Sequence, residues 1–216
     1  MRNIKFVLMM VVVCVLLGGC AKKLVKIDES WIQKPSKVKI VFTEPSIGSP
    51  KDLADDLPDF VDNFADWYKS QIEENLGRFS NGVRYSVEKV SRDLVTYEFS
   101  DMDGSNFKTP KMKMMDESAD VYLVMDDLWI GRVVSEEPTC MTTGGFNGMA
   151  TTTCAPDKFF TGRGRYAFFD AKTGTKLGYG DIESKVGYTF TVSRGDWIDV
   201  VRKTVNTMLE DTPIAK

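Results

Sequence analysis

Apolar and polar residues alternate along several stretches of the chain, which is the pattern of strands with one buried face. Residues 37–43 alternate charged and apolar side chains and then become wholly apolar, as expected for a strand that enters a core. The connection from Asp170 to Thr175 is polar and carries Gly174 near its end, which predicts a hairpin turn. The other predicted strands are residues 83–90, 94–99, 120–134, 159–169 and 176–186.

Two segments instead repeat apolar residues every three or four positions, the spacing of an amphipathic helix. The first extends from Leu53 to Leu76, and Pro58 either kinks it or separates a short turn from a main helix over 58–76. The second begins at Ser193, which forms a capping-box sequence with Asp196. Residues 100–118 show neither period and are predicted to be irregular. With no internal repeat, the elements indicate one α/β domain.

The first twenty residues have the order of a secretory signal. Arg2 and Lys5 are followed by an apolar run over 6–17 and then by Leu17-Gly18-Gly19-Cys20. The terminal cysteine makes the segment resemble the lipobox of bacterial lipoproteins, in which the chain is cut before Cys20 and that cysteine is lipidated. Two alternatives are a retained membrane helix, for which the run is short against the usual ~20 apolar residues, and ordinary cleavage at the glycines.

This interpretation divides the chain into a signal peptide over 1–19, a lipidated cysteine with its tether over 20–36, and a domain over 37–212. The tether, fully extended, would reach about 50 Å, although Trp31 and Ile32 could instead dock it onto the body. Loss of the two signal charges would change the formal net charge from −3 to −5. An acidic chain of this kind argues against a nucleic-acid partner.

Histidine is absent from the chain. Its absence removes the commonest general acid or base, the usual zinc and copper ligand, and every Ser-His or Cys-His nucleophile pair. Enzymes can use carboxylate pairs or Ser-Lys dyads instead, but composition makes catalysis less expected. We therefore predict a protein that is not an enzyme and that has no cofactor and no metal site.

Cys140 and Cys154 are predicted to form a disulfide, because an exported chain meets an oxidising compartment. The bridge would close a Thr- and Gly-rich loop over 141–153, within an insertion over about 132–158. Closing a loop of about 15 residues contributes about 3 kcal/mol in the entropic description. A redox or metal-binding pair is the alternative, which the lack of CxxC spacing disfavours.

Three further motifs have a chemical and a structural interpretation. The segment from Asp101 to Asn106 resembles the start of a calcium loop, but Met112 stands where a bidentate Glu is needed, so a turn is expected. A methionine cluster around Met112 could bind Cu(I) or form a hydrophobic edge. Trp67 and Trp129 could be ligand platforms or core residues. The cluster consists of Met112, Met114 and Met115.

Two charged motifs lie on predicted strands. Asp126 and Asp127 could bind metal or act in catalysis, but neighbours on a strand point to opposite faces, so solvated edge charges are expected. Gly162-Arg163-Gly164-Arg165 could suit an anion, but no helix follows it. A twisted or bulged strand start is the interpretation we favour there.

The element order and three short motifs resemble envelope lipoproteins with an anticodon-binding-domain-like fold. That group includes the curli-secretion lipoproteins, the lipoprotein activators of penicillin-binding proteins and the amino-terminal domain of the Tol translocation protein. The matching motifs are Ala119-Asp120 with the apolar residues after it, Phe169-Asp170 with Thr173-Gly174, and Trp197 in the closing helix. The resemblance implies a single mixed β-sheet with two helices packed on one face, and work in binding envelope proteins or assembling with them.

The sequence thus predicts a non-enzymatic binding or assembly module, anchored in the outer membrane by its lipid, with its domain in the periplasm or at the cell surface. Ala21, where an Asp would retain a lipoprotein at the inner membrane of enterobacterial-type cells, favours the outer membrane. An envelope protein is the expected partner, through Met141, Phe146 and Met149 of the disulfide-closed loop. A homo-oligomer is compatible with this. The alternatives are a carboxylate enzyme acting on cell-wall or polysaccharide material, and a small-molecule or metal carrier.

Overall fold

A computed structural model describes residues 24–79, 82–144 and 150–215. Its strands are β1 (Val25–Ile27), β2 (Lys37–Phe42), β3 (Ser46–Ile47), β4 (Arg84–Lys89), β5 (Val95–Met102), β6 (Ser105–Met112), β7 (Val121–Gly144), β8 (Ala150–Asp170) and β9 (Lys176–Gly187). Its α-helices are α2 (Pro50–Asp56), α3 (Phe64–Leu76) and α4 (Arg194–Leu209), and short 3-10 turns occupy Pro58–Phe60, Gly77–Phe79 and Arg92–Leu94.

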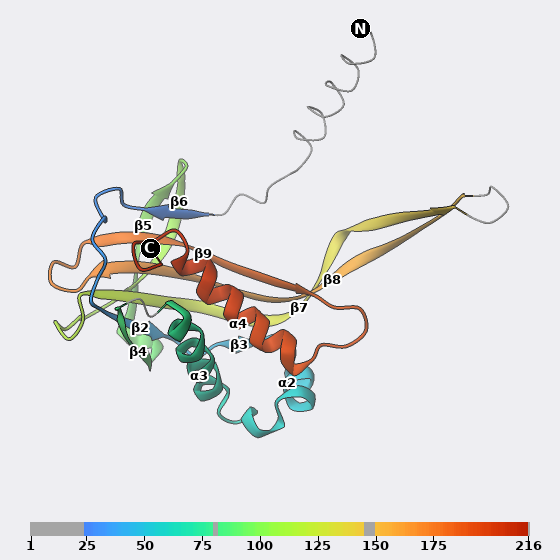
Figure 1. Cartoon of the computed structure of the whole chain (residues 1–216), viewed down its shortest axis with the longest axis horizontal. Helices are drawn as coiled ribbons and strands as arrows, with labels where there is room; N and C mark the ends of the chain where they lie inside the picture. The colour runs from blue at the N-terminus through green and yellow to red at the C-terminus, as the bar shows by residue number, and fades with distance from the viewer. Residues whose placement is uncertain (1–23, 80–81, 145–149, 216) are drawn as a thin grey trace, which may run out of the picture.

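Seven strands form one mixed sheet, as predicted (Figure 1). The strand order is β1-β9-β8-β7-β2-β4, and β3 adds to the outer part of β7. β2 is parallel to both β4 and β7, whereas β7, β8 and β9 follow one another as antiparallel neighbours. β2 lies between β7 and β4, and its apolar end is covered on both faces of the sheet, so Val41 and Phe42 are both buried.

The two predicted long helices, α3 and α4, pack side by side on one face of the sheet. Their apolar stripes meet the sheet in a cluster that includes Phe42, Ile72, Trp197 and Val201. The chain turns at Pro58 as a separate 3-10 segment, so α3 begins only at Phe64. The segment is therefore divided at Pro58 rather than kinked, but the piece before it is the helix α2 and the main helix starts at Phe64 instead of Pro58. The predicted capping box of α4 is also present.

The opposite face of the sheet is covered in part by a hairpin of β5 and β6. This corrects the prediction that residues 100–118 are irregular. The turn of the hairpin is Asp103-Gly104, and both residues have positive φ, 52° and 80°. A smaller apolar cluster lies beneath the hairpin, with Val41, Tyr122 and Phe169 at its centre. The sheet thus carries helices on one face and a β-hairpin on the other.

The segment before β2 is part of the fold, so of the two alternatives for the tether the structure adopts the docked one, through Trp31 and not Ile32. β1 pairs antiparallel with residues Gly178–Gly180 of β9, and the amide of Asp181 donates to the carbonyl of Leu24 at 3.0 Å. Trp31 is 8% exposed, and its ring centroid lies 5.1 Å from that of Phe168. Ile32, in contrast, is 81% exposed. Apolar burial of Trp31 and edge pairing of β1 together hold this segment on the body.

Candidate functional site

The most prominent feature outside the body is an arm formed by the ends of β7 and β8 (Figure 1). We define the arm as residues 138–144 and 150–156, whose ladder pairs Pro138 with Pro156 at the base and Gly144 with Ala150 at the last described position. A register shift between Val134 and Pro138 separates the arm from the rest of β7. The prediction of a loop over 141–153 is therefore wrong for its described part, which continues both strands, as suits the high β-propensity of threonine.

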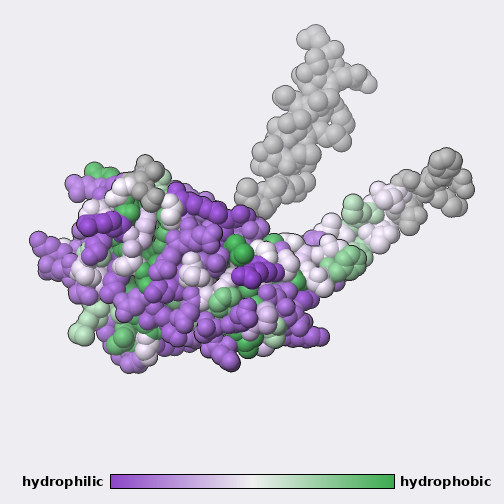
Figure 2. Space-filling view, turned by 60° about the horizontal axis from the view of Figure 1, so that its bottom comes forward, coloured by the Kyte–Doolittle hydropathy of each residue, from purple (hydrophilic) through white to green (hydrophobic). Residues whose placement is uncertain are grey.

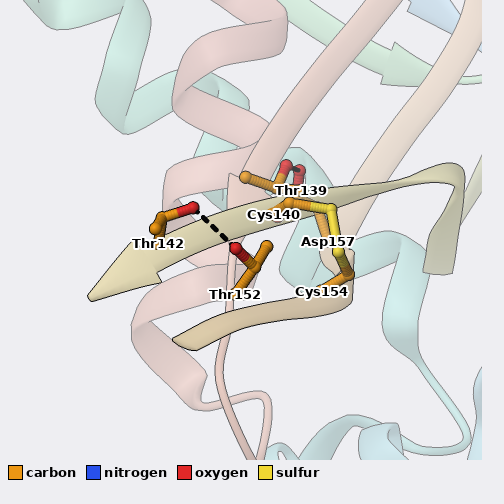
Figure 3. Close-up of a disulfide and its surroundings, with 6 residues drawn as sticks. All are labelled: Thr139, Cys140, Thr142, Thr152, Cys154 and Asp157. Atoms are coloured by element: carbon orange, nitrogen blue, oxygen red, sulfur yellow. Dashed lines mark hydrogen bonds between the residues drawn. A yellow bond between two sulfur atoms is a disulfide. The ribbon is translucent and has the colours of Figure 1, made fainter. Parts of the chain in front are cut away.

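The predicted disulfide between Cys140 and Cys154 is present and bridges the two strands of the arm directly (Figure 3). The Cα atoms of the pair are 4.0 Å apart, the close spacing of a pair without ladder hydrogen bonds. Two positions further, the hydroxyls of Thr142 and Thr152 are hydrogen-bonded at 2.9 Å. Thr139 donates to the carboxylate of Asp157 at 2.6 Å. Covalent and polar cross-strand contacts thus take the place of an apolar core.

The arm is neutral in an otherwise highly charged chain. No Asp, Glu, Lys or Arg occurs in the sequence from 138 to 156, although 27% of the whole chain is charged. Figure 2 shows the arm in pale and green tones beside a body that is largely purple. Charged side chains and prolines are the usual protection of a strand edge. Between Thr139 and Thr143 the arm has neither.

The prolines at the base of the arm occupy positions where they leave the internal ladder intact. Pro138 and Pro156 are opposite each other, two residues from the disulfide pair, so they also form a pair without ladder hydrogen bonds. At such a pair the backbone N–H points to the outer edge, and a proline there removes one outward donor. Cys140 and Thr142 keep their outward backbone N–H groups. On both outer edges of the arm, outward backbone N–H groups are therefore available from the disulfide pair toward the tip, and not at the proline pair.

Of the residues predicted to contact a partner, Met141 lies in the arm and is 69% exposed. Phe146 and Met149 lie outside the described residues, and so does the predicted lipidation site Cys20. Within the ranges that the structure describes, no helix is long and apolar enough to cross a membrane.

Asp126 and Asp127 are not the solvated edge charges that we predicted. Asp126 is fully buried and accepts hydrogen bonds from the hydroxyls of Thr43 and Tyr97. Asp127 has a φ of 51° in a bulge where β7 shifts register between Asp126 and Trp129. The bulge breaks the strict alternation of strand faces, so both carboxylates approach one cation, Arg92.

Asp127 is held by further cations from two other strands. The guanidinium of Arg165 donates to it at 3.1 Å, and Lys108 Nζ lies 3.9 Å away. Burial and the hydrogen bond to Asp126 raise the pKa of the Tyr97 phenol, so Tyr97 stays a neutral donor. Both carboxylates therefore satisfy structural partners. Among the described residues there is no group of three acidic or cysteine side chains that could hold a metal ion.

The Gly162–Arg165 motif lies in the middle of β8 rather than at a strand start, and the bulge is on β7 opposite it. A Cβ at Gly162 would lie 2.7 Å from Val200 of α4, so this glycine permits close helix packing. Arg163 and Arg165 face carboxylates on β9, at 3.8 Å in each pair. These groups line a surface pocket of about 370 Å³ together with Leu24, Asp127, Gly164 and Ile182. The pocket carries both signs of charge, so it is not a simple anion site.

The remaining motifs mainly form a turn or pack against the apolar clusters. The Asp101 carboxylate accepts from the Gly104 amide at 3.1 Å, as an ordinary hairpin turn requires. Met112 and Met115 pack against the cluster beneath the hairpin, and Met114 is 82% exposed. Trp67 is buried against Phe64 and the other aromatic residues of the helix face. Trp129 is half-buried on the hairpin side of the sheet.

Comparison with known proteins finds only weak structural likenesses. No protein-family model matches the chain, and no curated protein matches it. A neuraminyllactose-binding hemagglutinin homolog from Helicobacter pylori aligns with 82% of this chain and 83% of its own, at 13% identity and a TM-score of 0.39. The PelC dodecamer from Paraburkholderia phytofirmans, solved in two crystal forms, aligns with 88% of this chain at 10% identity and a TM-score of 0.37. These alignments cover 97% and 96% of the PelC chains. Matches at such TM-scores carry no information on activity or partner.

Proposed function

We propose that this protein is a non-enzymatic binding or assembly module of the bacterial outer membrane. A lipid on Cys20 anchors it, and the arm contacts another envelope protein. The observation that carries this proposal is the neutral arm, which projects from the body and has both faces and both edges exposed. An isolated two-stranded hairpin is marginally stable in water, so an arm of this form gains most when a partner covers it.

The backbone of the arm suits β-strand addition. In this mode an extended segment of the partner pairs with a free strand edge, and its main-chain hydrogen bonds supply the affinity. The outward donors of Cys140 and Thr142 are available on one edge, and those of Thr152 and Cys154 on the other. Neutral side chains, with exposed Met141 among them, avoid the cost of stripping water from charges at the contact.

The rival functions receive less support from the described residues. Asp126 and Asp127, the carboxylates of an enzymatic function, are both engaged by structural partners. A carrier needs an apolar cavity, whereas bulky side chains such as Phe42, Phe160 and Trp197 fill the space between sheet and helices.

Two substitutions at one position of the arm test the proposal. Thr142→Pro removes an outward N–H without breaking the internal ladder, whereas Thr142→Val changes the side chain and keeps that donor. We expect the proteins that co-purify with the mature lipoprotein from cell envelopes to be lost with Thr142→Pro and with deletion of 141–153. Thr142→Val should retain them. Unchanged recovery after the deletion would remove the arm from the proposed function.

The anchor has its own test, independent of the arm. We expect the intact mass of the purified protein to correspond to a chain that begins at acylated Cys20. A product that retains Met1, or an unmodified soluble chain, would contradict the lipoprotein assignment.

A further inference from the structure

The pairing of β1 fixes the place where the chain leaves the described body toward Cys20. Leu24 is held on β9, since its carbonyl accepts from the amide of Asp181. Three residues separate Cys20 from Leu24, and four steps along the chain span at most about 14 Å. A lipid on Cys20 therefore brings a membrane surface within about 14 Å of Leu24, rather than at the end of a long tether. This step rests on the proposed lipidation of Cys20.

Exposed apolar side chains lie around the same point. Phe99 of β5 is 73% exposed and Leu24 is 41% exposed. Phe99 lines an open groove of about 730 Å³ together with Lys26 and Ile27 of β1. Exposed apolar side chains that gather in one place, rather than singly, mark a surface that contacts a partner or a membrane. Phe and Leu are among the apolar side chains that interfacial proteins bury at the boundary between lipid headgroups and acyl chains.

The hairpin is fastened to β1 and β9 at this place, so the exposed residues form one surface. Lys26 Nζ donates to the carbonyl of Asp101 at 3.4 Å, and the hydroxyl of Tyr179 donates to the same carbonyl. The ring of Phe107, on the other strand of the hairpin, packs against Tyr179 with centroids 5.6 Å apart. Phe99 is thus presented from a supported strand rather than from a free loop.

We infer that this surface, which we call the β1 edge and define as Leu24, Lys26, Ile27 and Phe99, rests on the lipid bilayer with the Phe99 ring in the interface. The charges of the groove decide the kind of membrane. Asp28 and Glu29 line it together with Lys26 and Lys176, so two acidic and two basic groups balance, and a strongly anionic surface gains no net attraction there. The contact is therefore apolar in origin and suits a zwitterionic bilayer.

The cysteine content makes a labelling experiment clean. In the mature lipoprotein Cys14 is removed with the signal, acylation caps the sulfur of Cys20, and the other two cysteines form the disulfide. A cysteine introduced at either test position is then the only free thiol. Phe99→Cys probes the β1 edge. Phe190→Cys is the matched control, because Phe190 is 86% exposed and follows Tyr188, whose amide donates to the carbonyl of Lys158, two residues from the base of the arm.

Each variant is labelled with a polarity-sensitive fluorophore and reconstituted as the lipidated chain into phosphatidylcholine vesicles that contain a lipid-borne quencher. We expect a blue shift and strong quenching for the label at position 99, weak quenching at position 190, and no change in high salt. Equal quenching at the two positions in protein that floats with the vesicles would overturn the β1-edge inference alone. Protein that does not float and lacks the acyl mass would overturn the anchor as well.

Discussion

At the scale of single residues, the indole of Trp129 depends on the absence of side chains beneath it. The ring lies across Gly48 and Gly131, and a Cβ at Gly131 would lie 2.7 Å from its Cζ2 atom. The guanidinium of Arg163 flanks the ring at 5.8 Å from its centre. Two glycines that are far apart in the sequence thus make room for one half-buried tryptophan.

Gly131→Ala should destabilise the protein by about 1–3 kcal/mol, because the added methyl must displace the ring from a packed position. Gly187→Ala is the matched control, since a Cβ there meets nothing within 4 Å. The free energy of unfolding from urea titration measures both. Equal stability of the two variants would show that the ring moves aside without cost.

Asp120 joins the start of β7 to the start of β2. Its carboxylate accepts from the Ser36 hydroxyl at 2.7 Å and from the amides of Ser36 and Lys37 at 2.8 and 2.9 Å. These bonds, with the Ser36 hydroxyl first, lower the pKa of Asp120. The carboxylate of Asp120 therefore binds a proton more readily in the unfolded chain than in the folded one. The stabilisation of the fold by the charged carboxylate is present above the pKa of about 3.9 that Asp has in the unfolded chain, and it is lost as the pH falls through the lower pKa of Asp120 in the folded protein.

Asp120→Asn should therefore cost about 1 kcal/mol at pH 7, where the wild-type carboxylate is charged. The difference in unfolding free energy between wild type and variant should shrink as the pH falls below 4. Asp62→Asn, at an exposed site between the 3-10 turn and α3, is the control. A difference that stays constant with pH would mean that the charge on Asp120 contributes nothing.

Residue-level prediction failed where a local irregularity overrides the period of a strand. Adjacent Asp126 and Asp127 were expected to diverge, and on a regular strand they would. The positive φ of Asp127 and the one-sided bulge bring both toward Arg92. No pattern in a single sequence marks which residue of an apolar strand adopts such a conformation.

At the scale of elements, the arm differs from the rest of the fold in how it is stabilised. The described side chains of its strands, Met141 among them, are exposed and pack on neither sheet nor helices. The disulfide closes a loop within the arm, at a sequence separation of 14. Its effect on stability should therefore be local.

Replacing both cysteines, Cys140→Ser with Cys154→Ser, should speed amide exchange in the arm while the urea midpoint of the body stays nearly unchanged. Loss of a disulfide that closes such a loop costs about 3 kcal/mol, and this cost should lower the stability of the closed arm only, because the arm opens without unfolding the sheet. Hydrogen exchange with peptide resolution separates the two regions. A large fall in the midpoint of the body would show instead that arm and sheet unfold together.

Element boundaries were predictable where the chemistry of the ends is explicit. The capping box at Ser193 and the turn at Gly174 with φ of 68° are confirmed. Gly77, directly after α3, does not adopt the positive φ common for a glycine at the end of a helix, but is helical at −54° and begins a 3-10 turn. Of the β5–β6 hairpin, the strand over 94–99 was predicted. The second strand was missed although Asp103-Gly104 is a strong hairpin dipeptide, because residues 105–112 do not alternate apolar and polar side chains.

At the scale of the whole molecule, the docked segment before β2 sets how closely an anchor can hold the body. The three residues of β1 and the buried Trp31 hold this segment on the body. A three-residue strand is too short to show a period, and its partner lies over 150 residues away, so no local pattern could predict the pairing. The mixed sheet itself, whose strands are longer, was predictable.

Trp31→Ala should undock this segment, because burying the indole against Phe168 is its main apolar contact with the sheet. Loss of a buried tryptophan costs about 3–5 kcal/mol, more than a three-residue strand pairing restores. Limited trypsin digestion should then cut after Lys26, whereas the Lys34–Pro35 bond resists trypsin in wild type and variant alike. Ile32→Ala, at an 81% exposed neighbour, should leave the cleavage pattern of the wild type.

The sheet order also has a consequence in time. β1 is the first strand to be made, but β9, its partner, ends near the other terminus of the chain. The segment beside Cys20 must stay unpaired until residues 176–180 have been synthesised and placed, since a strand cannot form its ladder before its neighbour exists. Under the proposed lipidation of Cys20, the enzymes that process the amino terminus would thus meet a segment whose β1 residues are not yet paired, and completion of the sheet would then bring the body close to the lipid.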